Sequence, residues 1–192
     1  MKPNSKCLIV ILLLSLIGSG LFPGRAMAQR YIPKMSWMEV GAGSTEHLGF
    51  YVQADYGFYT RKKHHWKFGA HYRQDNYPCN TFKVPVADLT AEGGFFLRLF
   101  SDRKKTVFVS AGQQGIFGYE WVNWGSKRLD DGTVIQDRDR IIYGGALGLE
   151  IEYFLNDRYV LLLHVREKCI GGSDIGLWHT EYGAGLKMML NR

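Results

Sequence analysis

The chain has 192 residues, a formal net charge of +6 and an aromatic content of 14%. Its first 28 residues, which we predict to be removed on export, hold three bases and no acid, so the remaining chain carries a charge of +3. So small a positive charge does not indicate a nucleic-acid-binding protein. No later segment has 18 consecutive apolar residues, which excludes a transmembrane helix after the first segment.

The N-terminal segment is typical of a secretory signal peptide. Two lysines, Lys2 and Lys6, precede an apolar run over residues 7–22, and Ala26-Met27-Ala28 supplies a small-x-small cleavage site. We predict cleavage after Ala28, which leaves residues 29–192 as one domain. The alternative is a transmembrane anchor, but small and polar residues interrupt the apolar run, and a spanning helix needs about 20 apolar residues.

After the export segment, apolar residues recur at every second position. Side chains of a strand point alternately to its two faces, so this pattern predicts a wall between lipid and a packed interior. Gln113 breaks the alternation, which indicates a bulge or a position at the headgroup level. The predicted strands cover residues 35–43, 50–59, 66–73, 87–99, 107–114, 141–153, 159–166 and 177–190. The sequence therefore predicts an all-β fold, an eight-stranded antiparallel up-and-down outer-membrane β-barrel.

The predicted connections are short on one side and long on the other. The turns lie at residues 60–65, 101–105 and 155–158, and the outer loops at 44–48, 74–85, 120–138 and 168–177. This asymmetry is typical of outer-membrane barrels, as are aromatic girdles at both strand ends. The girdle candidates are Phe58, Trp66, Tyr153 and Tyr159 on the turn side, and Phe50, Tyr72, Tyr143 and Tyr182 on the loop side. The alternative is a soluble periplasmic sandwich or lipocalin-like barrel, which also alternates.

Polar residues fill the face that we assign to the interior. The predicted interior polar residues are Asp55, Lys67, His71, Arg73, Glu92, Arg98, Glu150, Glu152, His164, Arg166, Glu181 and Lys187. A barrel of eight strands is just wide enough for its side chains to fill it. We therefore expect a plug of paired charges, with an ion pathway as the alternative.

The sequence offers no catalytic, cofactor or metal motif. Some small outer-membrane barrels modify lipids, which would require a histidine and a serine that converge at one rim. His64 and His65 lie in a predicted polar turn, and His71 and His164 in the interior. No group of ligands has metal-site spacing. We predict a protein that is not an enzyme and uses no cofactor.

Two cysteines remain after export, one in each of two predicted outer loops. Export places Cys79 and Cys169 in an oxidising compartment, so they are candidates for a disulfide. That bond would close a loop of roughly 90 residues and stabilise the fold by about 4 kcal/mol in the chain-entropy model. The alternative is two unpaired thiols.

The long predicted loop over residues 120–138 is the candidate partner contact, because loops carry much of the binding in such scaffolds. Its candidate contact residues are Trp121, Trp124, Lys127, Arg128, Asp130 and Asp131. The Asp-Asp-Gly sequence at 130–132 is also compatible with a simple hairpin tip.

Several segments resemble a known family. These are Gln29 to Met35, Gly49-Phe50-Tyr51, Tyr77-Pro78, Asp88 to Gly94 and Gly112 to Tyr119. Together they resemble the conjugative transfer protein TraO family of Bacteroidetes conjugative transposons, over essentially the whole exported chain. The resemblance implies an envelope component of a DNA-transfer apparatus with no known reaction, and it supplies no functional residues.

We therefore expect a structural or assembly component of a conjugation system in the cell outer membrane, with the periplasm as the alternative location. Its expected partners are outer-membrane lipid and other conjugative-transfer proteins, without direct contact to nucleic acid. One alternative function is a general small barrel of the adhesin or opacity type, and another is a lipid-modifying enzyme. The sequence does not define the oligomeric state.

Overall fold

The computed structural model describes residues 35–46, 49–60, 64–79, 82–122, 139–173 and 176–190. The predicted signal peptide lies outside these residues and stays a prediction. The strands are β1 Ser36–Thr45, β2 Phe50–Tyr59, β3 His65–Cys79, β4 Phe82–Ser101, β5 Val107–Val122, β6 Arg140–Phe154, β7 Tyr159–Gly171 and β8 Trp178–Met189.

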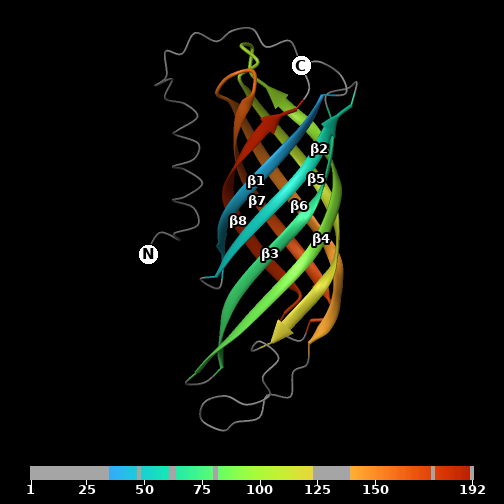
Figure 1. Ribbon diagram of the computed structural model, residues 1–192, viewed down its shortest axis with the longest axis vertical. Helices are drawn as coiled ribbons and strands as arrows, with labels where there is room; N and C mark the ends of the chain where they lie inside the picture. Colours follow the sequence, from blue (N-terminus) through green and yellow to red (C-terminus); the bar gives the residue numbers. More distant parts are fainter. Residues whose placement is uncertain are drawn as a thin grey trace, which may run out of the picture.

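The strands form one closed barrel in which each pairs antiparallel with its neighbours in the sequence (Figure 1). β1 closes the barrel against β8, in a register that sets Glu39 opposite Lys187. The predicted eight-stranded up-and-down barrel is therefore confirmed. Among the described residues no helix is long and apolar enough to cross a membrane.

Alternation along the strands separates an apolar outer wall from a polar interior. On β2 the burial pattern alternates strictly, with Phe50 48% exposed and Tyr51 fully buried. The outer wall carries large apolar side chains on every strand, such as Val40, Phe68 and Leu147. At the turn end, an apolar cluster of Trp37, Tyr59, Val160 and Met189 closes the interior.

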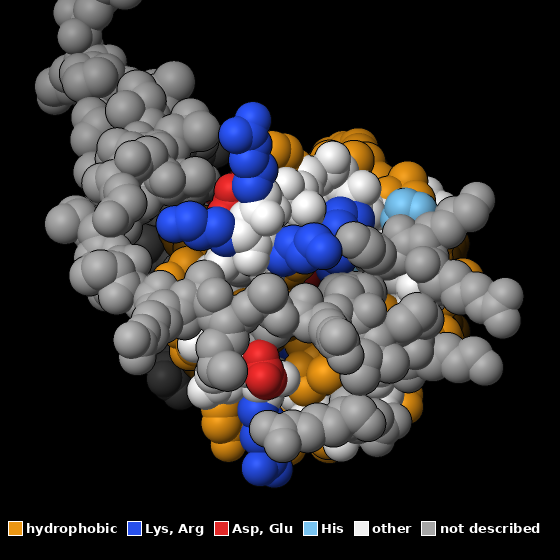
Figure 2. Space-filling model, turned by 90° about the horizontal axis from the view of Figure 1, so that it is seen from above, with side chains coloured by type: hydrophobic (Ala, Val, Ile, Leu, Met, Phe, Trp, Pro, Cys, Tyr) orange, Lys and Arg blue, Asp and Glu red, His pale blue; other side chains and the backbone are white. Residues whose placement is uncertain are grey.

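Short turns join the strands at one end of the barrel. In the turn after β6, Asn156 Oδ1 accepts hydrogen bonds from the backbone N–H of Arg158 and of Tyr159, both at 2.8 Å. In the turn after β4, Lys105 adopts a φ of 54°. Figure 2 looks onto this end, where Lys and Arg side chains gather. The exposed basic residues of the described turns are Arg103, Lys104, Lys105 and Arg158.

The opposite end differs from the prediction because a long hairpin replaces a predicted outer loop. Residues 74–79 and 82–85 are strand, paired from Gln74↔Ala87 to Cys79↔Phe82. β2 accompanies β3 only to Gln74, and β5 accompanies β4 only from Val86, so within the described residues the hairpin tip pairs with itself alone. Strand pairing outweighs the turn tendency of Pro78 and Pro85, and prolines on an edge also discourage pairing with other chains.

Three smaller predictions are also wrong. Lys168 belongs to β7 rather than to an outer loop, because the ladder with β6 continues to Gly171. His65 is not in a solvated turn, because it begins β3 with its side chain inside the barrel. Of the two alternatives predicted for Gln113, the bulge is wrong, because the register is continuous there and the irregularity of β4 lies between Arg98 and Phe100.

Candidate functional site

The candidate site is the charged interior of the barrel. Inward positions of the strands bring together acids and bases that lie far apart in the sequence. All twelve residues predicted for the interior lie there, eleven of them buried and Arg98 with a side chain that is 6% exposed. The ion pairs and hydrogen bonds of these residues show what the interior can do chemically.

A first group of charges lies toward the turn end. We call it the turn-side cluster, and it consists of Glu39, Lys67, Glu150, Glu152 and Lys187. Lys67 Nζ lies 2.9 Å from Glu39 Oε1 and 2.9 Å from Glu150 Oε1. Lys187 Nζ lies 2.6 Å from Glu152 Oε1 and 3.5 Å from Glu39 Oε2. Glu39 and Lys187 face each other on paired strands, whereas the other three contacts join strands that are not neighbours, so these side chains span the lumen and fill it.

Two further predicted residues belong beside this cluster. Asp55 Oδ2 lies 3.6 Å from Lys67 Nζ. Arg98 extends a terminal nitrogen to 3.7 Å from Glu152 Oε2, and its guanidinium carbon lies 4.1 Å from the ring centre of Phe108. Both side chains therefore continue the plug rather than line an open path.

A second group of charges lies nearer the loop end. We call it the mid-barrel cluster, and it consists of His71, Glu92, Arg166, Lys168 and Glu181. Arg166 donates to Glu92 Oε2 and to Glu181 Oε2, each at 3.0 Å. Lys168 Nζ lies 2.6 Å from Glu92 Oε1 and 3.2 Å from Glu181 Oε1. Two bases and two acids on β4, β7 and β8 thus neutralise each other, and His71 Nε2 lies 3.4 Å from Glu181.

The loop end of the interior carries a separate set of contacts. Arg73 donates from Nε to Asp88 Oδ2 at 2.6 Å, and Asp75 accepts a hydrogen bond from Thr45. Tyr77, on the protruding part of the hairpin, contacts His179 Nδ1 at 3.2 Å. Burial raises the pKa of the Tyr77 hydroxyl above its ordinary value, so this group stays protonated and donates.

The chemistry of these groups is that of a structural plug. Buried charges are costly unless they are paired and hydrogen-bonded, and here each cluster pairs acids with bases. Tyr51 and Tyr59 add hydroxyl contacts, to His164 and to Glu152 respectively. The remaining predicted interior residue, His164, therefore serves as a packing partner of Tyr51, whose ring centre lies 5.8 Å away.

Three interior residues, His65, Glu150 and Glu152, come close enough to hold a metal ion, with ligand atoms within 4.8 Å of one another. Their carboxylates already have cations, since Lys67 and Lys187 contact them at 2.9 Å and 2.6 Å. A divalent ion would have to displace those ammonium groups. The donor set therefore fits an ion-pair network better than a metal centre.

Sequence reasoning missed several members of these clusters. Glu39 lies on the first strand, where no clear alternation guided the assignment, and Lys168 fell in a predicted loop. His65 stacks on Phe96 at a centroid distance of 5.0 Å and lies 3.3 Å from Glu150. The sequence could have placed His65 in the interior, because His65 lies two residues before Lys67 and residues two apart on a strand share a face.

The other predicted site residues lie on the outer face of the barrel or outside the described residues. Cys169 carries a free thiol on the outer side of β7, while the side chain of Cys79 lies outside the described residues, so the disulfide stays a prediction. Trp121 lies near the end of β5 and contacts Tyr119, with ring centres 5.2 Å apart. The other predicted contact residues, Trp124, Lys127, Arg128, Asp130 and Asp131, lie outside the described residues.

Comparison with known proteins places the chain in a family. The family model described as conjugative transposon protein TraO matches residues 32–190. The chain belongs to the TraO family. This match confirms the resemblance seen in the sequence. Comparison with curated protein sequences gives no match.

Solved structures show what the TraO fold resembles. The crystal structure of Neisserial surface protein A covers 81% of this chain and 95% of its own, with a TM-score of 0.51 and 13% identity. Ail, the attachment invasion locus protein of Yersinia pestis, in complex with the heparin analogue sucrose octasulfate, covers 82% of this chain and 99% of its own, with a TM-score of 0.53 and 8% identity. At these identities the likeness concerns the fold alone, which is that of small outer-membrane barrels.

Proposed function

We propose that this protein is a non-enzymatic structural component of a conjugative DNA-transfer apparatus, embedded in the outer membrane. The observation that carries the proposal is the TraO family match over residues 32–190. The fold supports the location, because an apolar outer wall on a closed barrel suits a bilayer in which every backbone polar group must be paired.

The filled interior supports a role beside the DNA channel rather than as the channel. Lys67 and Arg166 each hold carboxylates from other strands across the lumen. The interior of an eight-stranded barrel has room for its own side chains and little else. DNA therefore passes elsewhere, and this protein supports or recruits the parts that conduct it.

The turn end offers a surface for such a partner. Arg103, Lys104, Lys105 and Arg158 are exposed there, beside the acidic residues Asp102 and Asp157. With short turns on the periplasmic side, this basic face points toward the periplasm. Charge of this kind steers an acidic partner surface toward the barrel.

The second candidate function is that of a surface adhesin. Ail is named as an attachment invasion locus protein, and its barrel resembles this one in fold. In an adhesin, the protruding hairpin of β3 and β4 would contact the surface to which the cell attaches. Dependence of DNA transfer on the protein favours the first function, and dependence of cell attachment favours the second.

A mating experiment tests the proposal. A clean deletion in the native host should lose transfer of the mobile element, and the full-length gene in trans should restore it. The variant R103A/K104A/K105A should restore transfer poorly, whereas Asn76→Ala at the opposite end should restore it fully. Outer-membrane fractionation with a heat-shifted band on a gel establishes for each variant that the barrel has assembled. Unchanged mating in the deletion strain would refute the transfer role.

A further inference from the structure

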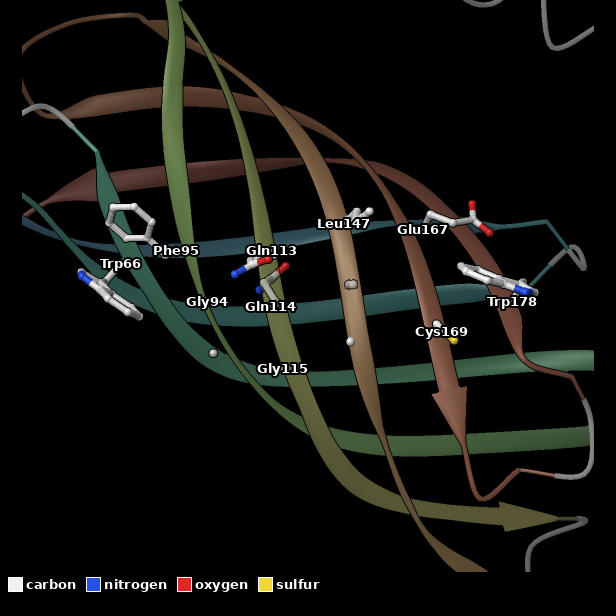
Figure 3. Close-up of a pocket in the computed structure, with 13 residues that line it drawn as sticks. Trp66, Gly94, Phe95, Gln113, Gln114, Gly115, Leu147, Glu167, Cys169 and Trp178 are labelled. Atoms are coloured by element: carbon white, nitrogen blue, oxygen red, sulfur yellow. The ribbon is translucent and has the colours of Figure 1, made fainter.

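A groove crosses the outer wall of the barrel from Trp66 on β3 to Trp178 on β8 (Figure 3). It has a volume of about 510 Å³. Its floor is a row of three glycines that pair in register, Gly93 with Gly115 and Gly115 with Gly145. The next positions in this row are Cys169 and Trp178.

Side chains form a ridge along each border of this floor. On one side Gln113 pairs with Leu147, and Leu147 with Glu167. On the other side Phe117 pairs with Tyr143, and both are 62% exposed. Leu147 is 67% exposed, more than any other exposed large hydrophobic residue of the described chain. Prominent side chains thus lie directly beside a hollow floor.

The packing of the chain itself does not require two of the floor glycines. A Cβ at Gly115 would have only the carbonyl oxygen of Gly93 near it, at 3.9 Å, and a Cβ at Gly145 would lie 3.4 Å from the Gln114 oxygen, an ordinary contact. Glycine in a strand is unfavourable when nothing demands it. The lack of side chains at these positions therefore suits something outside the barrel that approaches the backbone closely.

Gln113 indicates the chemistry of that occupant. Its side chain is exposed on the outer wall, between its cross-strand neighbours Phe95 and Leu147, and it makes no hydrogen bond with the described residues (Figure 3). In hydrocarbon an unpaired amide is unfavourable, so a hydrogen-bonding partner is needed there. A lipid acyl chain offers none.

We propose that this groove binds a second copy of the same chain. A primary amide both donates and accepts, so two Gln113 side chains related by a twofold axis satisfy each other. The same axis lets the Leu147 ridge of each copy enter the glycine floor of the other. The described lining residues include one acid, Glu167, and no base, so the groove does not attract lipid phosphate groups. The inference rests on the outer-membrane location proposed above and is independent of the transfer role.

Cysteine cross-linking in isolated outer membranes tests the proposal. In the full-length chain with C79S and C169S, Gln113→Cys should form a disulfide-linked dimer on mild oxidation. The contacts of Leu147 with the glycine floor remain in this variant, and the twofold axis brings the two cysteines together, so the disulfide takes the place of the amide pair. Val40→Cys is the matched control, since Val40 is exposed on β1, four strands away from β5 around the barrel. It should stay monomeric. Equal cross-linking of the two variants would indicate random collision and overturn the proposal, as would the absence of a Gln113→Cys dimer.

A second variant fills the groove. Gly115→Leu, added to Gln113→Cys, should abolish the dimer while the heat-shifted band remains, because a Cβ at Gly115 has only the Gly93 carbonyl oxygen near it, at 3.9 Å. Ala42→Leu on the outer face of β1 is the control and should leave the dimer intact. Dimers that persist with Gly115→Leu would overturn the proposal. A protein absent from the outer membrane would refute the location, whereas a heat-shifted band without cross-linking would refute the dimer alone.

Discussion

Lys67 on β3 and Glu150 on β6 meet across the lumen, with Nζ 2.9 Å from Oε1, although two strands separate them around the barrel. Neither residue is exposed by more than 1%. The pair ties opposite walls together and sits at the centre of the turn-side cluster.

Loss of this lysine should destabilise the barrel strongly. Lys67→Met leaves Glu150 and Glu39 as buried acids without their shared cation, and removal of one partner of a buried pair costs about 3–5 kcal/mol. Urea unfolding of the refolded barrel in lipid vesicles measures this loss. Lys104→Met in an exposed turn should change stability by less than about 0.5 kcal/mol. A Lys67→Met barrel as stable as the parent would show that the pair contributes nothing.

The geometry of Arg166 should matter beyond its charge. Two different guanidinium nitrogens reach Glu92 and Glu181, each at 3.0 Å, and a lysine at this position cannot reproduce that fork. Arg166→Lys should therefore reduce the free energy of unfolding by about 1–3 kcal/mol. The same urea titration checks it, with Arg158→Lys at the exposed turn as the control. Equal midpoints for the two variants would contradict the prediction.

Glycines of the interior should behave differently from those of the groove. A Cβ at Gly183 would clash with the Tyr51 hydroxyl and with the Ala42 carbonyl oxygen, whereas a Cβ at Gly115 would have only the Gly93 carbonyl oxygen near it, at 3.9 Å. Gly183→Leu should destabilise the barrel by at least about 3 kcal/mol or prevent its assembly, because overpacking forces backbone shifts. The heat-shifted band should disappear for Gly183→Leu and persist for Gly115→Leu. A heat-shifted band in both variants would contradict the predicted difference between interior and groove glycines.

The export prediction is tested at the N-terminus. N-terminal sequencing of the protein from the native envelope should begin at Gln29, because Ala26 and Ala28 fit the small-residue requirement of the cleavage site. Ala28→Arg should block processing and retain a longer species. A native protein that still begins at Met1 would refute the signal peptide.

The state of Cys169 is open to direct labelling. As a free thiol on the outer side of β7, it should react with a maleimide in the denatured protein without prior reduction. Cys169→Ser, which keeps Cys79, identifies the part of the signal that belongs to Cys169. If labelling at Cys169 appears only after reduction, the disulfide predicted from the sequence exists.

The fold was largely predictable from the sequence because its signal is local. A period of two assigns each side chain to one wall of a sheet, and that sufficed for the apolar outer face and for the twelve interior polar residues. Strand ends were less predictable. The segment around Pro78 and Pro85 carries turn residues, yet it forms the protruding hairpin because the neighbouring ladder extends into it.

The sequence by itself determined that Lys67, Glu150, Arg166 and Glu92 face inward. Only the tertiary structure decided that Lys67 meets Glu150 and that Arg166 meets Glu92, because closure of the barrel sets which inward residues share a level across the lumen. The groove has the same origin. Gly93, Gly115 and Gly145 become one floor only through the register of three strands, which depends on long-range pairing and not on any local pattern.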